Sequence, residues 1–92
     1  MITLCICYDL NSPGQDYKDL IDKIKSLGMW WHYLDSTWMV NTSRTPVEVR
    51  NLLMPFLDSN DELLVFKVGS LWTGYGFDQK AYEWLQMNWQ SG

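Results

Sequence analysis

The sequence ITLCICYD at residues 2–9 decides the fold, because it is apolar on both of its alternating faces. A strand of that kind is buried on both sides, so we expect it at the centre of a sheet. Asn11-Ser12-Pro13-Gly14 then predicts a turn. The next stretch predicts a helix, since its apolar residues repeat at helical spacing: Tyr17, Leu20, Ile21, Ile24 and Leu27. We expect Asp16 to cap the start of this helix and Gly28 to end it.

A β-hairpin is predicted after this helix. Residues 29–34 and 37–41 favour strands, and Asp35-Ser36 between them favours a tight turn. Strict alternation in the first of these strands places its side chains on two faces, with Trp30, His32 and Leu34 on one and Trp31 and Tyr33 on the other.

The second helix carries three start signals. Thr45 is a capping residue, Pro46 stands at the first helical position, and Glu48 follows the cap by three residues. The apolar stripe of this helix consists of Val49, Leu52, Leu53, Phe56 and Leu57. Pro55 lies inside the stripe, so we expect a kink or a break in the last turn.

The last third of the chain predicts one more strand and one more helix. Residues 63–68 favour the strand, residues 69–77 form a loop rich in glycine and aromatic residues, and Asp78 can cap the helix. The apolar members of this helix are Ala81, Tyr82, Trp84, Leu85 and Trp89. The order predicts one domain over residues 1–92, an α+β ferredoxin-like βαββαβ sandwich with an added C-terminal helix.

Composition and charge exclude several classes of protein. The 92 residues carry 11 acidic and 7 basic side chains, a formal net charge of -4 that weighs against binding of duplex nucleic acid or anionic membranes. No apolar run approaches the roughly 18 residues of a membrane span. The first residues lack a signal peptide, which predicts a cytoplasmic protein. We expect Cys5 and Cys7 to be reduced thiols whose side chains lie about 6–7 Å apart along one strand.

The predicted topology sorts the polar residues onto two ends of the sheet. One end gathers acids, among them Asp9, Asp35 and Asp61. The other end brings Arg44 and the start of the second helix toward the loop that carries Trp72 and Tyr75. A helix N-terminus favours phosphate, and aromatic rings stack on bases, so Arg44, Thr45, Trp72 and Tyr75 predict a site for a nucleotide or a similar small phosphate ligand. In the alternative interpretation, the aromatic residues of the loop pin the last helix to the core, with Phe77 packed on Tyr82.

Both faces of the predicted sheet are apolar, so helices on one face leave the other to be covered. The C-terminal helix or a partner subunit must cover it, and a homodimer or a higher homo-oligomer is the simplest solution. A stacking platform for RNA bases is the competing interpretation, which the scarcity of basic residues on the strands weakens.

Three short segments resemble a known family. Cys7-Tyr8-Asp9-Leu10-Asn11, the hairpin Asp35-Ser36-Thr37-Trp38 and Glu62-Leu63-Leu64-Val65 are similar to those of SinR-family small proteins, which are related to the CRISPR-associated small dimeric endoribonuclease and integration subunit. The resemblance covers roughly residues 2–68. It implies a dimeric ferredoxin-like fold in which Asp9 binds a divalent metal such as Mg²⁺ across the dimer axis and serves in phosphodiester cleavage. From the residues alone, Asp9 is also a candidate cap for the turn at residues 11–14.

Two functions follow from these patterns. The favoured one is a non-catalytic homo-oligomeric binding module for a nucleotide or a similar small phosphate compound, with an expected role in phage–host immunity. The alternative is a metal-dependent nuclease that uses Asp9. The sequence departs from the nuclease pattern because it is acidic and ends in a tryptophan-rich helix.

Overall fold

The computed structural model describes residues 1–12, 14 and 16–92, so Pro13 of the predicted turn lies outside the described residues. Strands and helices follow one another in the predicted order, and a short 3-10 helix (η1) follows the second helix. Their bounds are β1 Ile2–Asp9, α1 Lys18–Lys25, β2 Met29–Leu34, β3 Thr37–Thr42, α2 Pro46–Leu53, η1 Met54–Phe56, β4 Glu62–Lys67 and α3 Gln79–Asn88.

The four strands form one antiparallel sheet in the order β2-β3-β1-β4. β1 lies between β3 and β4, with Leu4 opposite Val40 and Ile6 opposite Val65. The doubly apolar first strand is therefore central, as its sequence predicts. This arrangement of a four-stranded antiparallel sheet with helices is consistent with a ferredoxin-like α+β fold.

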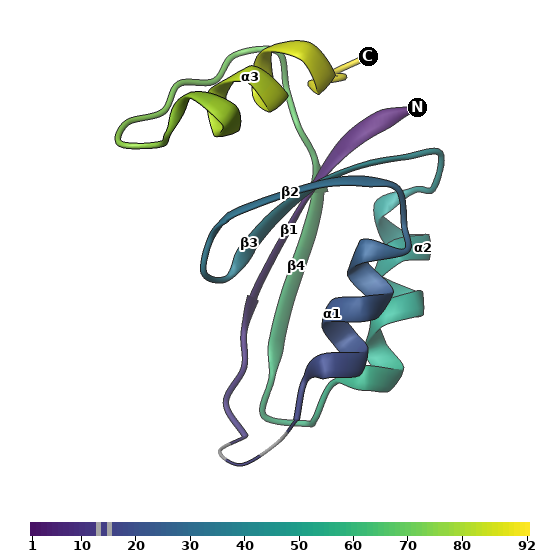
Figure 1. Ribbon diagram of the computed structural model, residues 1–92. Coiled ribbons are helices and arrows are strands. Elements are labelled where there is room, and N and C mark those ends of the chain that lie inside the picture. Colours follow the sequence, from purple (N-terminus) through teal and green to yellow (C-terminus); the bar gives the residue numbers. More distant parts are fainter. Residues whose placement is uncertain (13, 15) are drawn as a thin grey trace.

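One face of the sheet is covered by α1 and α2, which lie side by side (Figure 1). The core between sheet and helices consists of the buried residues Leu4, Ile6, Tyr8, Leu20, Ile24, Leu27, Trp38, Val40, Val49 and Leu53. The indole of Trp38 is fully buried there, and its Nε1 donates a hydrogen bond to the Tyr8 hydroxyl at 2.9 Å. That bond satisfies both polar groups inside an apolar layer.

The other face is covered in part by α3, which lies on the opposite side of the sheet from α1 and α2 (Figure 1). Trp31 of β2, Ala81 and Leu85 form a small second core there. Farther along the same face, Leu64 and Phe66 of β4 remain 60% and 43% exposed. Of the two expected ways to cover this face, the C-terminal helix or a partner subunit, the helix is present, and it leaves part of the face exposed.

β2 departs from strict alternation. The register with β3 shifts between Trp31 and Leu34, and Leu34 pairs with Thr37. Leu34 consequently lines a cavity together with Trp31, on the face covered by α3, instead of sharing the face of Trp30 and His32. Our expectation for Leu34 was wrong, because a bulge in a short strand adds a residue that an alternation pattern does not reveal.

The helix ends follow the start and stop signals closely. Thr45 and Glu48 form a capping box, and α2 ends at Leu53, where Pro55 forces the tighter η1. Asp78 caps α3 through a hydrogen bond from the Ala81 backbone N–H. The start of α1 differs from the prediction, because its N-cap residue is Tyr17, without a side-chain cap hydrogen bond. Asp16 lies one residue earlier and accepts a hydrogen bond from the Lys18 backbone N–H.

Gly28 has a different role from the predicted one. It follows α1 without adopting the left-handed conformation, which among the described glycines only Gly14 and Gly76 adopt. A Cβ atom on Gly28 would lie 1.8 Å from the carbonyl oxygen of Asn41 in β3. Glycine is required here because two backbone segments come close together.

Candidate ligand-binding site

An aromatic cavity lies between α3 and the sheet. It has a volume of about 140 Å³. β2 and β3 supply its floor, the loop before α3 supplies one wall, and α3 with the residue after it supplies the roof. The lining residues are Trp31, Leu34, Met39, Trp72, Thr73, Phe77, Leu85 and Trp89.

The indole groups around this cavity are held by the backbone. Trp31 Nε1 donates to the carbonyl of Ala81 at 3.1 Å, and Trp89 Nε1 donates to the carbonyl of Gly69 at 2.7 Å. The rings of Trp72 and Trp89 lie 5.5 Å apart, tilted by 30°. Because the N–H groups of Trp31 and Trp89 are already used, these two rings offer a ligand their apolar surfaces.

A buried polar network fixes the C-terminal end of α3 on the sheet. Thr3 donates from its hydroxyl to Asn41 Oδ1 and accepts from the backbone N–H of Gln90. Asn41 Nδ2 donates to the carbonyl of Asn88 at 2.8 Å. Thr3 and Asn41 are both buried, so the network satisfies polar groups that would otherwise destabilise the second core.

The predicted phosphate-binding residues lie on another part of the molecule. Arg44 and Thr45 precede α2, the helix that packs on the opposite face of the sheet from Trp72. Thr45 Oγ1 accepts from the Glu48 backbone N–H at 3.2 Å, and the Thr45 N–H donates to Glu48 Oε1 at 3.0 Å. The Thr45 backbone N–H lowers the pKa of the Glu48 carboxyl, which places a negative charge where the phosphate was expected.

The loop before α3 divides its aromatic residues between two roles. Tyr75 is 97% exposed, whereas the ring of Phe77 packs edge-on against Trp31 at 5.2 Å and against Tyr82 at 5.6 Å. Trp72 is half-buried in the cavity wall. The loop therefore pins α3, as the alternative interpretation predicts, and it also builds the cavity.

Asp9 lies opposite Glu62 in the register of β1 and β4. The two acids and Cys7, Tyr8 and Leu64 line a shallow cavity of about 170 Å³. Like charges on directly opposed residues destabilise a sheet, and a bound cation would remove that repulsion. Mg²⁺ accepts one or two carboxylates completed by water, so this pair fits such an ion. Among the described residues, however, no three histidine, cysteine or acidic side chains gather in a way that could hold a metal.

Asp61 is a structural residue that sequence reasoning did not single out as the cap. Its carboxylate accepts hydrogen bonds from the backbone N–H groups of Asn11 and Asp58, each at 2.8 Å, and from the Tyr17 hydroxyl. It thereby ties the loop after β1 to the turn before β4. Within the described residues the Asp9 carboxylate accepts no hydrogen bond. The Asn11 backbone N–H donates to the Asp61 carboxylate instead, and Asn11 Nδ2 donates to the backbone carbonyls of Asp9 and Asn60.

The two cysteines lie closer together than their positions predict. Their Sγ atoms are 3.5 Å apart on one face of β1. Both are free thiols. Burial, together with the neighbouring Cys7, raises the pKa of Cys5 to about 12, so Cys5 stays a protonated thiol at neutral pH.

No protein family model matches the chain. Among the described residues, none of the helices combines the length and the apolar character that crossing a membrane requires.

Proposed function

We propose that the protein is a non-catalytic homo-oligomeric binding module for a nucleotide or a similar small phosphate ligand, and that the base of the ligand enters the aromatic cavity. The single observation that carries the proposal is the concentration of Trp31, Trp72, Phe77 and Trp89 around one cavity. Stacking on aromatic rings holds bases of any sequence, since every base has a π face.

The size of the cavity decides which part of the ligand it takes. Sites that enclose a whole drug-sized molecule measure about 300–1,000 Å³. A volume of about 140 Å³ accepts one planar ring and leaves the sugar and phosphate outside. Arg44 and Thr45 lie away from this cavity, so phosphate binding by these two residues stays a separate prediction, which Arg44→Ala tests.

Nucleotide titration followed by tryptophan fluorescence tests this proposal. Nucleosides and mono-, di- and cyclic nucleotides should quench or shift the emission, and Trp72→Ala should weaken binding by about 1–3 kcal/mol, the magnitude of a lost stack. Leu71→Ala is the matched control, because Leu71 lies in the same loop and is 95% exposed. Tyr75→Ala reports on the predicted contact of Tyr75 without disturbing the core. If no nucleotide changes the tryptophan fluorescence of the wild-type protein, the proposal of a nucleotide ligand is wrong.

The homo-oligomer is supported by the part of the sheet that α3 leaves open. Leu64 and Phe66 are exposed neighbours on one face of β4. A dimer that brings a second copy next to them agrees with the dimeric state implied by the SinR-family similarity, which rests on segments such as Asp35-Ser36-Thr37-Trp38. We place such a module in the cytoplasm, in phage–host conflict. Light scattering at tens of micromolar should give a dimer, and a 10.9 kDa monomer would contradict it.

A second candidate function is cleavage of nucleic acid with Mg²⁺ bound at Asp9. The specific observation in its favour is that Asp9 and Glu62 lie opposite each other and line one cavity. When bound, the ion would supply an activated water, and the two carboxylates would hold it. Asp9→Asn and Glu62→Gln should each abolish Mg²⁺-dependent cleavage of RNA or DNA while circular dichroism stays unchanged. A wild-type protein that cleaves neither substrate rules this function out.

A further inference from the structure

β4 has one free edge. It is the last strand of the sheet and pairs only with β1 among the described residues. Its middle consists of four apolar residues, Leu63-Leu64-Val65-Phe66, with a charged residue only at each end. Natural proteins protect edges with charges or bulges, and the opposite edge strand, β2, has a register shift of that kind. β4 is the unprotected edge of this sheet.

The backbone groups on this edge follow from the pairing with β1. The Val68 N–H donates to the carbonyl of Thr3 at 3.1 Å, which continues the register in which Lys67 lies opposite Leu4. Hydrogen-bonded pairs alternate with non-bonded pairs in an antiparallel ladder. The N–H and C=O groups of Leu63, Val65 and Lys67 therefore point away from β1, toward the free edge.

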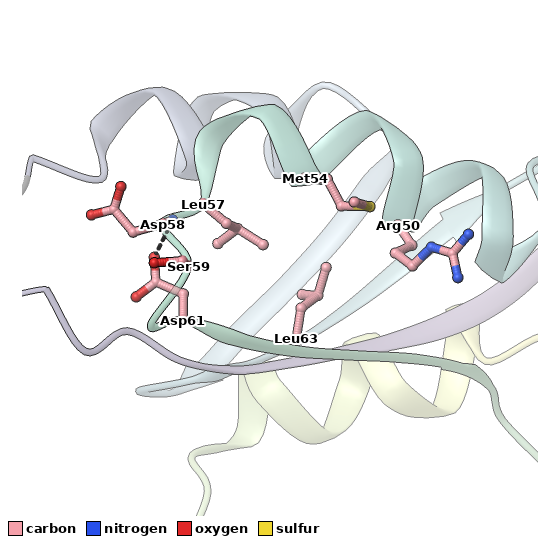
Figure 2. A pocket seen from close by; sticks show the side chains of 7 residues that line it. All are labelled: Arg50, Met54, Leu57, Asp58, Ser59, Asp61 and Leu63. Atoms are coloured by element: carbon pink, nitrogen blue, oxygen red, sulfur yellow. Dashed lines mark hydrogen bonds between the residues drawn. The ribbon is translucent and has the colours of Figure 1, made fainter.

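A groove runs beside this edge, between β4 and the helical segment formed by α2 and η1. Its volume is about 320 Å³. Asp58 and Asp61 lie at one end, Arg50 lies at the other, and Met54 and Leu63 lie between them (Figure 2). The end near the start of β4 is thus acidic, whereas the strand itself ends in the basic Lys67.

We propose that β4 pairs with β4 of a second copy, antiparallel about a two-fold axis at Val65, so that the two sheets form one continuous sheet. Val65 then lies opposite the partner's Val65, and Leu63 lies opposite the partner's Lys67. These are the positions whose backbone groups point away from β1, so the new ladder leaves the pairing between β4 and β1 intact. The inference rests on the proposed homo-oligomer and names the surface that forms it.

Charge complementarity favours a second copy over an unrelated strand. The antiparallel arrangement brings the partner's Lys67 beside Leu63, at the end of the groove that carries Asp58 and Asp61. A parallel arrangement in the same register would place the two Lys67 side chains together. On the other face, Leu64 lies opposite the partner's Phe66, and these two exposed side chains gain a cross-strand neighbour.

Cysteine cross-linking tests the register directly. Position 64 and the partner's position 66 form a non-hydrogen-bonded pair, whose Cα atoms lie about 4.5 Å apart, within disulfide range. Leu64→Cys and Phe66→Cys are made separately on a chain carrying Cys5→Ala and Cys7→Ala, since Cys7 and Cys5 are their neighbours on β1. Under mild oxidation, a mixture of the two variants should form covalent dimers, and each variant alone should not. Equal cross-linking in all three samples, or none in the mixture, overturns the proposal.

A charge reversal tests the same surface without new cysteines. Lys67→Glu places a third acid beside Asp58 and Asp61 of the partner and should weaken dimerisation at least tenfold in sedimentation. Lys80→Glu is the matched control, because Lys80 is exposed on α3 and lies outside β4. A dimer that forms without the 64–66 cross-link and tolerates Lys67→Glu overturns edge pairing but leaves the homo-oligomer intact. A monomer overturns both.

Discussion

At the scale of single residues, Gly28 is a position where a side chain would collide with the backbone. A Cβ atom there would lie 1.8 Å from a backbone oxygen of β3, and backbone cannot move aside as a side chain can. We expect Gly28→Ala to lower the free energy of unfolding by about 3 kcal/mol, the upper range for overpacking. Urea denaturation measures this. Gly69→Ala is the control, since nothing lies within 4 Å of its Cβ position, and an equal loss in both variants would contradict the explanation.

Asp61 makes stability depend on pH in the acid range. Desolvation alone would raise the pKa of its carboxyl, but hydrogen bonds from the Asn11 and Asp58 N–H groups and from the Tyr17 hydroxyl bring the pKa below its ordinary 3.8. The unfolded chain then binds the proton more readily than the folded one. The stabilisation is therefore complete above the unfolded pKa and is lost as the pH falls through the folded pKa.

Replacement of the carboxylate should remove this dependence. Asp61→Asn should be less stable than the wild type at pH 7 and should lose less stability on acidification below about pH 4. Urea midpoints between pH 7 and pH 3 measure the difference. Asp19→Asn, an exposed change on α1, is the control, because it leaves the hydrogen bonds to the Asp61 carboxylate in place. Parallel pH profiles for the wild type and Asp61→Asn would show that another group controls acid stability.

At the scale of elements, the capping box of α2 has a measurable effect on stability. Thr45→Ala removes the side-chain acceptor for the Glu48 N–H and should cost about 1 kcal/mol in urea unfolding. Thr45→Ser retains a hydroxyl at the same position and should stay close to the wild type. If the alanine and serine variants lose equal amounts of stability relative to the wild type, α2 requires the Thr45 methyl group and not the hydrogen bond.

Local signals in the sequence were sufficient for most element boundaries. Thr45, Pro46 and Glu48 placed the start of α2, Pro55 placed its end, and Asp78 placed the start of α3, because each acts within one turn of the backbone. The bulge that redirects Leu34 was missed, since it depends on the pairing of β2 with β3.

The candidate site was less predictable than the elements, because it depends on contacts between distant parts of the chain. Trp72 was expected near Arg44, since both residues follow strands that finish at the same end of the sheet. The loop instead crosses to the face covered by α3, where Trp72 packs near Trp89 and Trp89 binds the Gly69 carbonyl. No periodicity in residues 69–77 indicates which face such a loop will take.

At the scale of the whole molecule, the sheet separates two cores of unequal size. Among the residues that the structure describes, the core under α1 and α2 contains ten buried residues, one of which is Trp38, and the core under α3 contains three: Trp31, Ala81 and Leu85. Because buried apolar surface is the main source of cohesion, we expect α3 to be held more weakly than the central strands. The sheet lies between the cores, so loss of the smaller one need not disturb the larger.

The difference in size between the two cores predicts which part of the molecule opens first. Amide hydrogens of α3 should exchange with solvent through partial openings that leave the rest of the chain folded, whereas those of β1 and β3 should exchange only when the whole chain unfolds. In native-state exchange with low urea, the rates in β1 should rise steeply with urea and those in α3 should stay nearly flat. A common slope would mean that the chain opens as one unit. Separate slopes would mean that α3 opens repeatedly while the rest of the chain stays folded. Each opening would expose the aromatic cavity to solvent, at a rate set by the stability of α3 alone.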